Sequence, residues 1–302
     1  MNIPKALNIG DTIGIIAPSG PLRKKNMEEI KVAIEGYGYR VKVGESCYLK
    51  HKGYLAGDDK TRAKDIEKMF VDNEVDAIMC LRGGYGTSRL LDKINYKIIS
   101  ENPKIFIGFS DITALHIVFN QMCNLSTYHG IMAYTAQKWD EFTYDSLLNA
   151  LNFKEELIIE NPIEEKIHTI YPGQAEGLLV GGNLSLMISS LGTRYEINTK
   201  NKILFIEEIG EYIYKLDRML MHLYHAGKLN DCNGIIYGDF NDCMKFNDDD
   251  NDIIDLLKEI SQKVKKPSIY NLQAGHCMPM LTLPLGTHCN INANDQIVKF
   301  MK

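Results

Sequence analysis

A serine directly after a short apolar stretch gives the sharpest chemical signal in the chain. Ser110 follows residues 105–109, with a glycine at position 108, and stands before a stretch of helical character. A serine at a strand-to-helix turn is held outward on a tight bend, where the glycine leaves room and the helix N-terminus favours negative charge. These features predict a nucleophile, although a helix N-cap accounts for the same position equally well. Ile112 occupies the second glycine position of G-x-S-x-G, so the α/β-hydrolase signature is absent.

A glycine-rich segment follows the apolar residues 77–81. Gly83, Gly84 and Gly86 lie within four positions, and such loops let backbone N–H groups approach a ligand. One interpretation is an oxyanion hole for the negative oxygen of a tetrahedral intermediate. A phosphate cradle and a plain tight turn are the alternatives. Neither G-x-x-x-x-G-K-[ST] nor G-x-G-x-x-G occurs, which argues against a nucleotide-binding Rossmann enzyme.

A serine nucleophile needs a base, and the base needs an acid that orients it. His276 lies in an expected loop, where functional side chains are common. Glu207 ends the apolar run 203–206, and Glu208 follows it immediately. Alternation along a strand would send one of these carboxylates inward and the other outward. The residue types alone do not choose between them or pair either with His276, which equally suits a histidine that braces its loop.

Three other groups of reactive residues have simpler explanations. Cys277 has no elbow or glycine-rich context of its own and is expected to be a small buried residue. His222 and His225 stand three apart on an expected helix, but no third metal ligand accompanies them. The acidic stretch 247–252 lacks EF-hand spacing and is expected to be a solvated loop that caps the next helix. We therefore predict no metal and no cofactor.

The composition fits a soluble globular protein and excludes several partners. Apolar residues make up 45% and charged residues 24% of the 302 residues, and the net charge is −5. This charge gives no reason to expect nucleic acid or an anionic membrane as partner. Seven cysteines without a C-x-x-C pair indicate reduced thiols. The N-terminus lacks a signal peptide and no apolar run is bilayer-sized, so we expect a cytoplasmic protein.

The elements that must position these residues alternate in type through the first half. Short apolar or alternating runs predict strands at residues 12–17, 38–43, 77–81 and 104–109. Helical spacing or charge predicts helices at residues 26–36, 60–73 and 113–122. Repeated β–α units favour a parallel sheet covered by helices on both faces. Such sheets place their sites in the loops at the carboxyl ends of the strands.

The second half predicts a separate, mixed domain. Acidic and β-rich residues at 149–172 indicate a linker. Beyond it we expect strands at 202–206 and 234–237 and a helix at 215–225. The predicted organisation is an N-terminal α/β domain at 1–148 with the serine and the glycine loop, the linker, and a C-terminal domain at 173–302 with the glutamate and histidine.

These segments resemble one family: the LD-carboxypeptidases (muramoyltetrapeptide carboxypeptidases) and the related microcin-immunity peptidases. The matching motifs keep the family's order almost from end to end. They are residues 10–19, 82–86 with 89–91, 108–113, 129–130, 181–184, 205–208 with 217–220, and 275–276 with 284–286. The resemblance implies an N-terminal Rossmann-like parallel-sheet domain and a smaller C-terminal β-rich, barrel-like α+β domain. It also implies a site between the domains, usually in a homodimer.

The resemblance assigns roles to five residues. It makes Ser110 the nucleophile, His276 the general base and Glu207 the orienting acid. It implies an oxyanion hole from the backbone N–H groups of Gly84 and Asp111. The implied enzyme is a metal-independent serine carboxypeptidase that hydrolyses the L,D amide bond and releases terminal D-alanine from cytoplasmic murein peptides.

Substrate recognition is the less specific part of this prediction. Arg82 and Arg89 are candidates for binding substrate carboxylates, and surface or loop-bracing roles suit them equally. One alternative is a microcin-immunity-type peptidase that cleaves an aminoacyl-nucleotide antibiotic, for which Trp139 is the only available tryptophan clamp. Another is a non-catalytic small-ligand-binding protein on the same scaffold.

The sequence departs from the family pattern at three places. Phe109 stands where tyrosine is expected and Glu208 where aspartate is commoner, and residues 213–215 replace a proline-tyrosine-arginine run. These departures leave the expected triad in place and bear on substrate preference.

Overall fold

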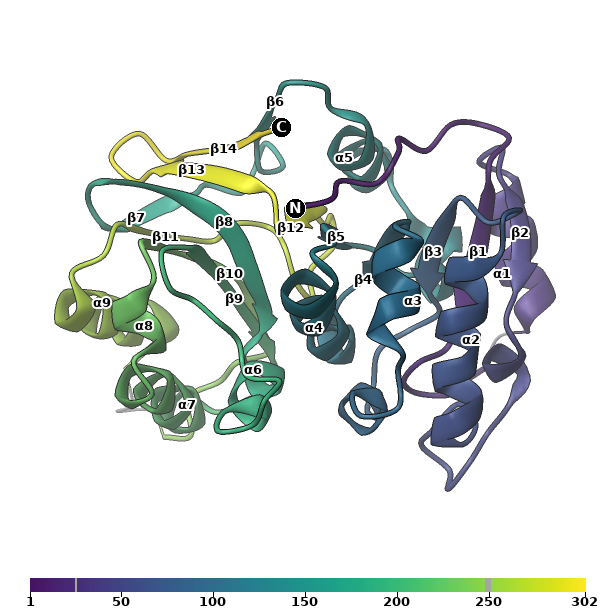
Figure 1. Cartoon of the computed structure of the whole chain (residues 1–302). Coiled ribbons are helices and arrows are strands. Elements are labelled where there is room, and N and C mark those ends of the chain that lie inside the picture. Colours follow the sequence, from purple (N-terminus) through teal and green to yellow (C-terminus); the bar gives the residue numbers. More distant parts are fainter. Residues whose placement is uncertain (25, 248–250) are drawn as a thin grey trace. The chain divides into compact units, whose positions relative to one another are not determined.

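The chain folds into two compact units. The computed structural model describes residues 1–24, 26–247 and 251–302. The N-terminal unit comprises residues 1–152 together with 282–284, and the C-terminal unit comprises residues 153–281 and 285–302. The predicted fold class, an α/β protein of two domains, is confirmed: the first unit contains a largely parallel sheet and the second a mixed sheet (Figure 1).

The N-terminal unit is built on a six-stranded sheet in the order β12-β5-β4-β3-β1-β2. Strands β1 to β5 pair in parallel. The strands are β1 (Thr12–Ile16), β2 (Arg40–Val43), β3 (Ala77–Cys80), β4 (Ile105–Gly108), β5 (Thr127–His129) and β12 (Leu283–Leu285). The central strands β1, β3 and β4 are buried along their whole length, as expected of a parallel sheet covered on both faces.

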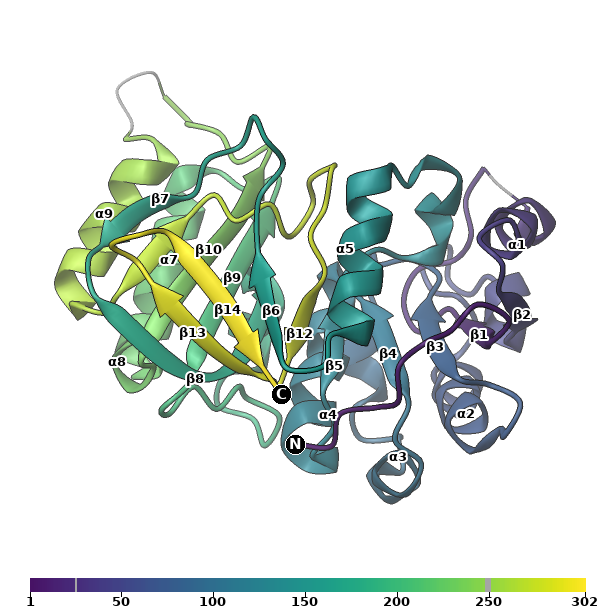
Figure 2. The ribbon, with the colours of Figure 1, turned by 90° about the horizontal axis from the view of Figure 1, so that it is seen from above.

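Helices cover both faces of this sheet. Figure 2 shows α2 (Asp59–Val71), α3 (Tyr96–Glu101) and α4 (Thr113–Cys123) on one face, with α1 (Met27–Glu35) and α5 (Glu141–Asn152) on the other. Three phenylalanines from α2, β4 and α4 join the first face to the sheet. The Phe106 ring centroid lies 6.2 Å from that of Phe70 and 4.9 Å from that of Phe119. This aromatic packing fixes α4, the helix that follows Ser110.

The C-terminal unit contains an eight-stranded sheet in the order β6-β14-β13-β8-β9-β10-β11-β7. Its centre, β8 to β11, is parallel, and the outer pairs are antiparallel. The strands are β6 (Glu156–Ile159), β7 (His168–Tyr171), β8 (Gln174–Asn183), β9 (Ile203–Ile209), β10 (Gly234–Asn241), β11 (Ser268–Tyr270), β13 (His288–Asn292) and β14 (Ile297–Met301). The two outermost strands, β6 and β7, fall within residues 149–172.

Within the described residues, four helices accompany the second sheet. They are α6 (Leu184–Ser190), α7 (Ile213–His225), α8 (Lys228–Asp231) and α9 (Ile253–Val264), and Figure 1 shows α7, α8 and α9 against one face of the sheet. Asp252, from the acidic stretch, caps α9 by accepting the Asp255 N–H at 3.0 Å. Residues 248–250 of that stretch lie outside the described residues. No helix in the described part of the chain has the length and apolarity to span a bilayer.

Parallel pairing brings three loops of the N-terminal unit to one edge of the sheet. β3 lies between β1 and β4, so the segments after these strands, residues 17–21, 81–86 and 109–112, begin at neighbouring carboxyl ends. This edge is where parallel sheets place ligands. Ser110 and the glycine loop both lie there.

Candidate active site

Ser110 stands on a strained turn between β4 and α4. Its φ is +64°, a left-handed conformation that costs a non-glycine residue about 1–2 kcal/mol. A short 3₁₀ turn, Ser110–Ile112, leads directly into α4. At Gly108 a Cβ atom would lie 3.0 Å from the Ile112 side chain and 3.2 Å from Cys80 Cβ, so glycine lets the chain bend here. Strain of this kind is concentrated at functional positions.

A buried histidine supports the turn from below. The His116 side chain is fully buried, and its Nε2 lies 2.8 Å from the Gly108 carbonyl oxygen. Burial lowers the pKa of His116 to about 4, so the ring is neutral at pH 7. Because the carbonyl can only accept, Nε2 carries the ring proton. His116 therefore braces the strand end that precedes the serine.

The glycine loop lies directly against Ser110. A Cβ atom at Gly83 would lie 2.9 Å from Ser110 Cβ and 3.0 Å from its Oγ. Gly84 has φ +129° and Gly86 has φ +136°, in the region that only glycine adopts without strain. The loop therefore combines close approach to the serine with a backbone path that needs glycine, as an oxyanion loop requires.

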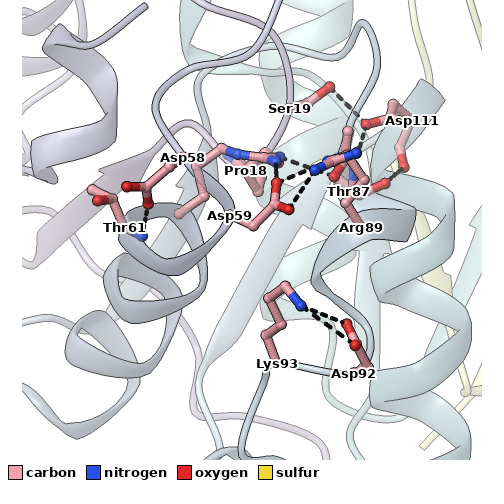
Figure 3. Close-up of polar contacts among 12 residues, drawn as sticks. Pro18, Ser19, Asp58, Asp59, Thr61, Thr87, Arg89, Asp92, Lys93 and Asp111 are labelled. Carbon is pink, nitrogen blue, oxygen red and sulfur yellow. Dashed lines mark hydrogen bonds and ion pairs between the residues drawn. The ribbon is translucent and has the colours of Figure 1, made fainter. Parts of the chain in front are cut away.

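A buried carboxylate connects the loops around Ser110 (Figure 3). Asp111 is 2% exposed. Its Oδ2 accepts the Ser19 hydroxyl at 2.7 Å and the Thr87 backbone N–H at 2.9 Å. The Thr87 hydroxyl in turn donates to the Asp111 carbonyl oxygen. Asp111, predicted from the sequence only as a backbone donor, thus also has a side chain that holds its surroundings together.

A buried arginine holds the same loops from the side of α2. The Arg62 side chain is 0% exposed, and its Nη1 donates to the carbonyl oxygens of Pro18, at 2.5 Å, and Gly86, at 2.9 Å. Its Nη2 pairs with Asp59 Oδ1 at 2.5 Å. Arg89 binds both oxygens of the same carboxylate, at 2.9 and 2.6 Å (Figure 3). These bonds, that from Arg89 first, lower the pKa of Asp59.

Both arginines predicted to bind substrate have partners within the N-terminal unit. Arg89 forms the bidentate pair with Asp59. Arg82 donates to the Pro21 carbonyl at 3.2 Å, and its guanidinium carbon lies 5.9 Å from the centroid of the Tyr134 ring. Substrate binding by Arg82 and Arg89 stays a prediction, and these contacts hold both guanidinium groups in fixed places.

In the C-terminal unit the structure pairs His276 with Glu207. The His276 Nδ1 lies 2.7 Å from Glu207 Oε2, and the Glu207 side chain is 0% exposed. Glu208, its neighbour on β9, serves the start of α6 instead. It accepts the Asn183 amide at 2.8 Å and the Ser185 backbone N–H at 2.8 Å. Both carboxylates are buried, at 0% and 3% exposed, so the expectation that one of them points outward is wrong. The hydrogen bonds at 2.7 and 2.8 Å instead join the two side chains to different partners.

The charges around His276 favour its protonated form. Burial by itself would lower the pKa of His276, but the hydrogen bond and charge of Glu207, followed by the charges of Glu208 and Asp239, raise this pKa above its ordinary value. A carboxylate on Nδ1 keeps the proton of the neutral ring on that nitrogen and leaves Nε2 to accept one. The pair has the form of a general base with its orienting acid.

The end of β10 holds the loop that carries His276. The Asn241 side chain donates to the His276 carbonyl at 2.8 Å, and the Asp239 N–H donates to the Ala274 carbonyl at 3.0 Å. Gly275 has φ +132°, and a Cβ there would lie 3.0 Å from Glu207 Oε2. The register between β9 and β10 shifts around Asp239, and such bulges redirect side chains beside active sites. Sequence reasoning missed Asp239 and Asn241 because neither belongs to a motif.

Asp239 adds an unpaired carboxylate oxygen to this region. Its Oδ2 is buried and has no hydrogen-bond partner among the described residues. Burial, followed by the charge of Glu207, raises the pKa of Asp239 to about 6. Asp239 therefore stays close to its titration point near neutral pH.

The other reactive residues have ordinary surroundings. Burial raises the pKa of the Cys277 thiol to about 12, so it is not a thiolate. His222 and His225 lie in the last turn of α7, and the described part of the chain contains no group of three histidine, cysteine or acidic residues arranged for a metal. Trp139 is 8% exposed and packs against Tyr37, with ring centroids 5.2 Å apart.

Comparison with known proteins matches both units to one family. Residues 13–130 match the family model of the LD-carboxypeptidase N-terminal domain. Residues 176–291 match the family model of the LD-carboxypeptidase C-terminal domain. A probable murein peptide carboxypeptidase of Bacillus subtilis (strain 168) is 40% identical over 302 residues, which cover 97% of this chain and 92% of the relative.

Two solved structures share the fold. A muramoyltetrapeptide carboxypeptidase from Oxalobacter formigenes has a TM-score of 0.84 at 24% identity, covering 96% of this chain and 97% of its own. The microcin C7 self immunity protein MccF has a TM-score of 0.91 at 23% identity, covering 100% and 99%. At these identities the likeness concerns the fold alone.

The domain matches, with 40% identity over nearly the whole length, place the protein among the serine peptidases. More narrowly, the chain belongs to the LD-carboxypeptidase family.

Proposed function

We propose that this protein is a serine carboxypeptidase that hydrolyses the L,D amide bond and releases terminal D-alanine from murein tetrapeptides. The observation that carries the proposal is the 2.7 Å bond between His276 Nδ1 and the buried Glu207 carboxylate. That pair supplies the base and acid that the strained Ser110 needs. The name of the Bacillus subtilis relative supports the murein substrate. The proposal includes action in the cytoplasm, as a homodimer, in peptidoglycan recycling.

In the proposed mechanism Ser110, Glu207 and His276 form one catalytic triad. Ser110 Oγ attacks the scissile carbonyl while His276 Nε2 takes its proton, and Glu207 stabilises the imidazolium. His276 then protonates the leaving D-alanine amine, and water attacks the acyl-enzyme with His276 as base again. The chemistry needs no metal.

Two backbone donors complete the proposed mechanism. The N–H groups of Gly84 and Asp111 are assigned to the negative oxygen of each tetrahedral intermediate. Loss of one such donor typically raises the barrier by about 3–4 kcal/mol. The close approach of the glycine loop to Ser110 supports this assignment.

The test is an assay on a defined peptide. We expect the intact chain to convert L-Ala–γ-D-Glu–diaminopimelate–D-Ala into the tripeptide, seen by mass spectrometry as loss of one alanine residue. Ser110→Ala and His276→Ala should each lower the rate by roughly 10⁴-fold or more, and a chelator should leave it unchanged. His225→Ala, at the exposed end of α7, is the matched histidine control. Full activity in the serine variant would refute the mechanism.

A microcin-type substrate is the alternative within the same chemistry. An aminoacyl-nucleotide substrate calls for an exposed aromatic ring to stack on its base, and the tryptophan predicted for that role, Trp139, is buried against Tyr37 and does not supply it. Without this tryptophan clamp, we expect an aminoacyl sulfamoyl adenosine to be cleaved more slowly than the murein peptide. The reverse preference would move the assignment to the microcin-immunity branch.

A further inference from the structure

The Asp111 carboxylate occupies the point where three loops of the N-terminal unit meet. Ser19 follows β1, Thr87 closes the glycine loop after β3, and Asp111 itself follows β4. Its Oδ2 accepts hydrogen bonds from both of the other loops, at 2.7 Å from the Ser19 hydroxyl and 2.9 Å from the Thr87 N–H (Figure 3). One buried oxygen thus fixes the spacing between three strand ends.

The glycine loop depends on such external anchors. Its residues Gly83, Gly84 and Gly86 have no side chains through which neighbouring residues can hold them, and glycine restricts its own backbone least. The far end of the loop is held from two sides, by Arg62 on the Gly86 carbonyl and by Asp111 on the Thr87 N–H. Without the Asp111 side-chain bond, Arg62 and the bond from the Thr87 hydroxyl to the Asp111 carbonyl oxygen would still hold this end, but the acceptor of the Thr87 N–H and the link to Ser19 would be lost.

The position of the loop has little tolerance. The place of a Cβ on Gly83 is only 2.9 Å from Ser110 Cβ, so the backbone of the loop touches the serine. A displacement of about 1 Å in an active site can cost about a hundredfold in rate. Asp111 also directly follows Ser110, whose left-handed conformation needs support from its surroundings.

We propose that the Asp111 side chain is a positioning residue: its carboxylate fixes the glycine loop against Ser110 and so sets the geometry of the oxyanion hole. The inference rests on the serine mechanism proposed above, but not on the murein substrate. It gives Asp111 two separate tasks, a backbone N–H that meets the oxyanion and a side chain that places the second donor.

A fluorophosphonate probe tests the inference without a peptide substrate. Ser110 Oγ displaces fluoride from phosphorus, the serine proton passes to the histidine base, and the phosphonyl oxygen enters the oxyanion hole. The second-order labelling rate therefore reports the geometry of that hole. Asp111→Ala, which removes both acceptor bonds, should lower this rate and kcat by about 10²-fold, with KM within about threefold.

Graded variants distinguish positioning from mere folding. Asp111→Asn keeps one side-chain oxygen that can accept a hydrogen bond, so its labelling rate should fall only about tenfold. Ser19→Ala removes one of the two donors to Asp111 Oδ2, and its labelling rate should also fall about tenfold. The control is Asp65→Ala: Asp65 is equally buried and its Oδ2 accepts the Ser46 N–H at 2.6 Å, in the 3₁₀ turn Glu45–Tyr48. The Asp65→Ala variant should be less stable than the wild type, but each folded molecule should be labelled at the wild-type rate.

The outcomes are decisive in each direction. Wild-type labelling rates in folded Asp111→Asn and Ser19→Ala would overturn the inference, whether or not Asp111→Ala folds. No labelling of Ser110 in the wild-type chain would overturn it together with the serine mechanism. Normal labelling without cleavage of the murein tetrapeptide would reject only the substrate assignment, and the graded loss among the variants would still support the inference.

Discussion

Glu207 acts on His276 through one hydrogen bond and one charge, and a single substitution separates its effect from packing. Glu207→Gln preserves the size of the side chain and removes the charge. We expect kcat/KM to fall by about 10³–10⁴-fold, because the imidazolium loses its partner and the ring its fixed tautomer. Since Glu207 raises the pKa of His276, the acid limb of the pH–rate profile should also move to lower pH.

The neighbouring carboxylate provides the comparison for this measurement. Glu208→Gln weakens the bonds to Asn183 and Ser185 at the start of α6, so it should lower the melting temperature more than the rate. Profiles of kcat/KM against pH for Glu207→Gln and Glu208→Gln, measured between pH 5 and 9, check both expectations. An unchanged kcat/KM in Glu207→Gln would contradict the assigned role.

Asp239 predicts an unusual dependence of stability on pH. Its pKa is raised to about 6 in the folded protein, so the folded state holds this proton more tightly than the unfolded state. The contribution of Asp239 to the free energy of unfolding therefore falls as pH rises from about 4 to about 6, and it stays unfavourable at higher pH. Asp239→Asn should be more stable than the wild type at pH 8, by about 1 kcal/mol after allowance for solvent screening.

Thermal denaturation at two pH values checks this prediction. The advantage of Asp239→Asn should be present at pH 8 and nearly absent at pH 4, where the folded wild-type carboxyl is protonated and the unfolded one is about half protonated. A variant that is less stable than the wild type at pH 8 would show that Asp239 has a partner that stabilises its charge.

At the scale of elements, two glycines separate backbone strain from displacement of the site. Gly275 and Gly192 both have positive φ, at +132° and +76°. A Cβ on Gly275 would lie 3.0 Å from Glu207, whereas one on Gly192 would meet no atom within 4 Å. Substitution by alanine should destabilise both by about 1 kcal/mol. Only Gly275→Ala should lose activity, by about tenfold or more, because the His276 loop must move.

Chemical denaturation and initial rates on both alanine variants measure the two effects. Equal activity in the two would mean that the loop carrying His276 relaxes without cost to the pair.

The sequence predicts the elements that carry the site better than it predicts their connections. The apolar runs at residues 12–17, 77–81 and 104–109 become β1, β3 and β4, with ends within a residue or two, because strands buried on both faces read as apolar runs. β12 was not predicted, since three residues reveal nothing of a partner strand more than 150 positions earlier. The helix at 253–264 was foreseen only through its capping aspartate.

The side chains of the site show the same division. Ser110 and the glycine loop have local signatures, and both lie where parallel strands end. The choice between Glu207 and Glu208 needed the structure, because both are buried, at 0% and 3% exposed, and differ only in partner. The Asp111 bonds to Ser19 and Thr87 join residues 92 and 24 positions apart, and no spacing rule reveals them.

At the scale of the whole molecule, the N-terminal sheet is not made from one continuous segment. Residues 282–284, from the last tenth of the chain, belong to the N-terminal unit, and Leu283 and Pro284 are two of the three residues of β12, which lies next to β5. Thr282 donates its N–H to the Ser146 hydroxyl on α5 at 2.9 Å. A Cβ at Gly130 would lie 2.5 Å from Thr282 Oγ1. Residue 282 therefore packs directly against the backbone of Gly130, which follows β5.

A fragment ending at residue 152 should therefore be incomplete. Without β12 the edge of β5 is unpaired, and exposed strand edges promote association. We expect fragment 1–152 to melt at lower temperature than the intact chain and to self-associate in sedimentation experiments. Addition of a synthetic peptide spanning residues 280–287 should raise its melting temperature, and a scrambled peptide should not. A monomeric fragment that melts like the intact chain would contradict this prediction.

This arrangement sets an order of events during synthesis. The ribosome makes β5 early and β12 only after nearly all of the C-terminal unit, so a nascent chain presents the open β5 edge while about half of its length is still being translated. A chain that stalls before residue 282 keeps that edge exposed, where chaperones and proteases find incomplete molecules. Completion of the N-terminal sheet, at the edge two strands from β4 and the nucleophile that follows it, is thereby tied to the synthesis of residues 283–285.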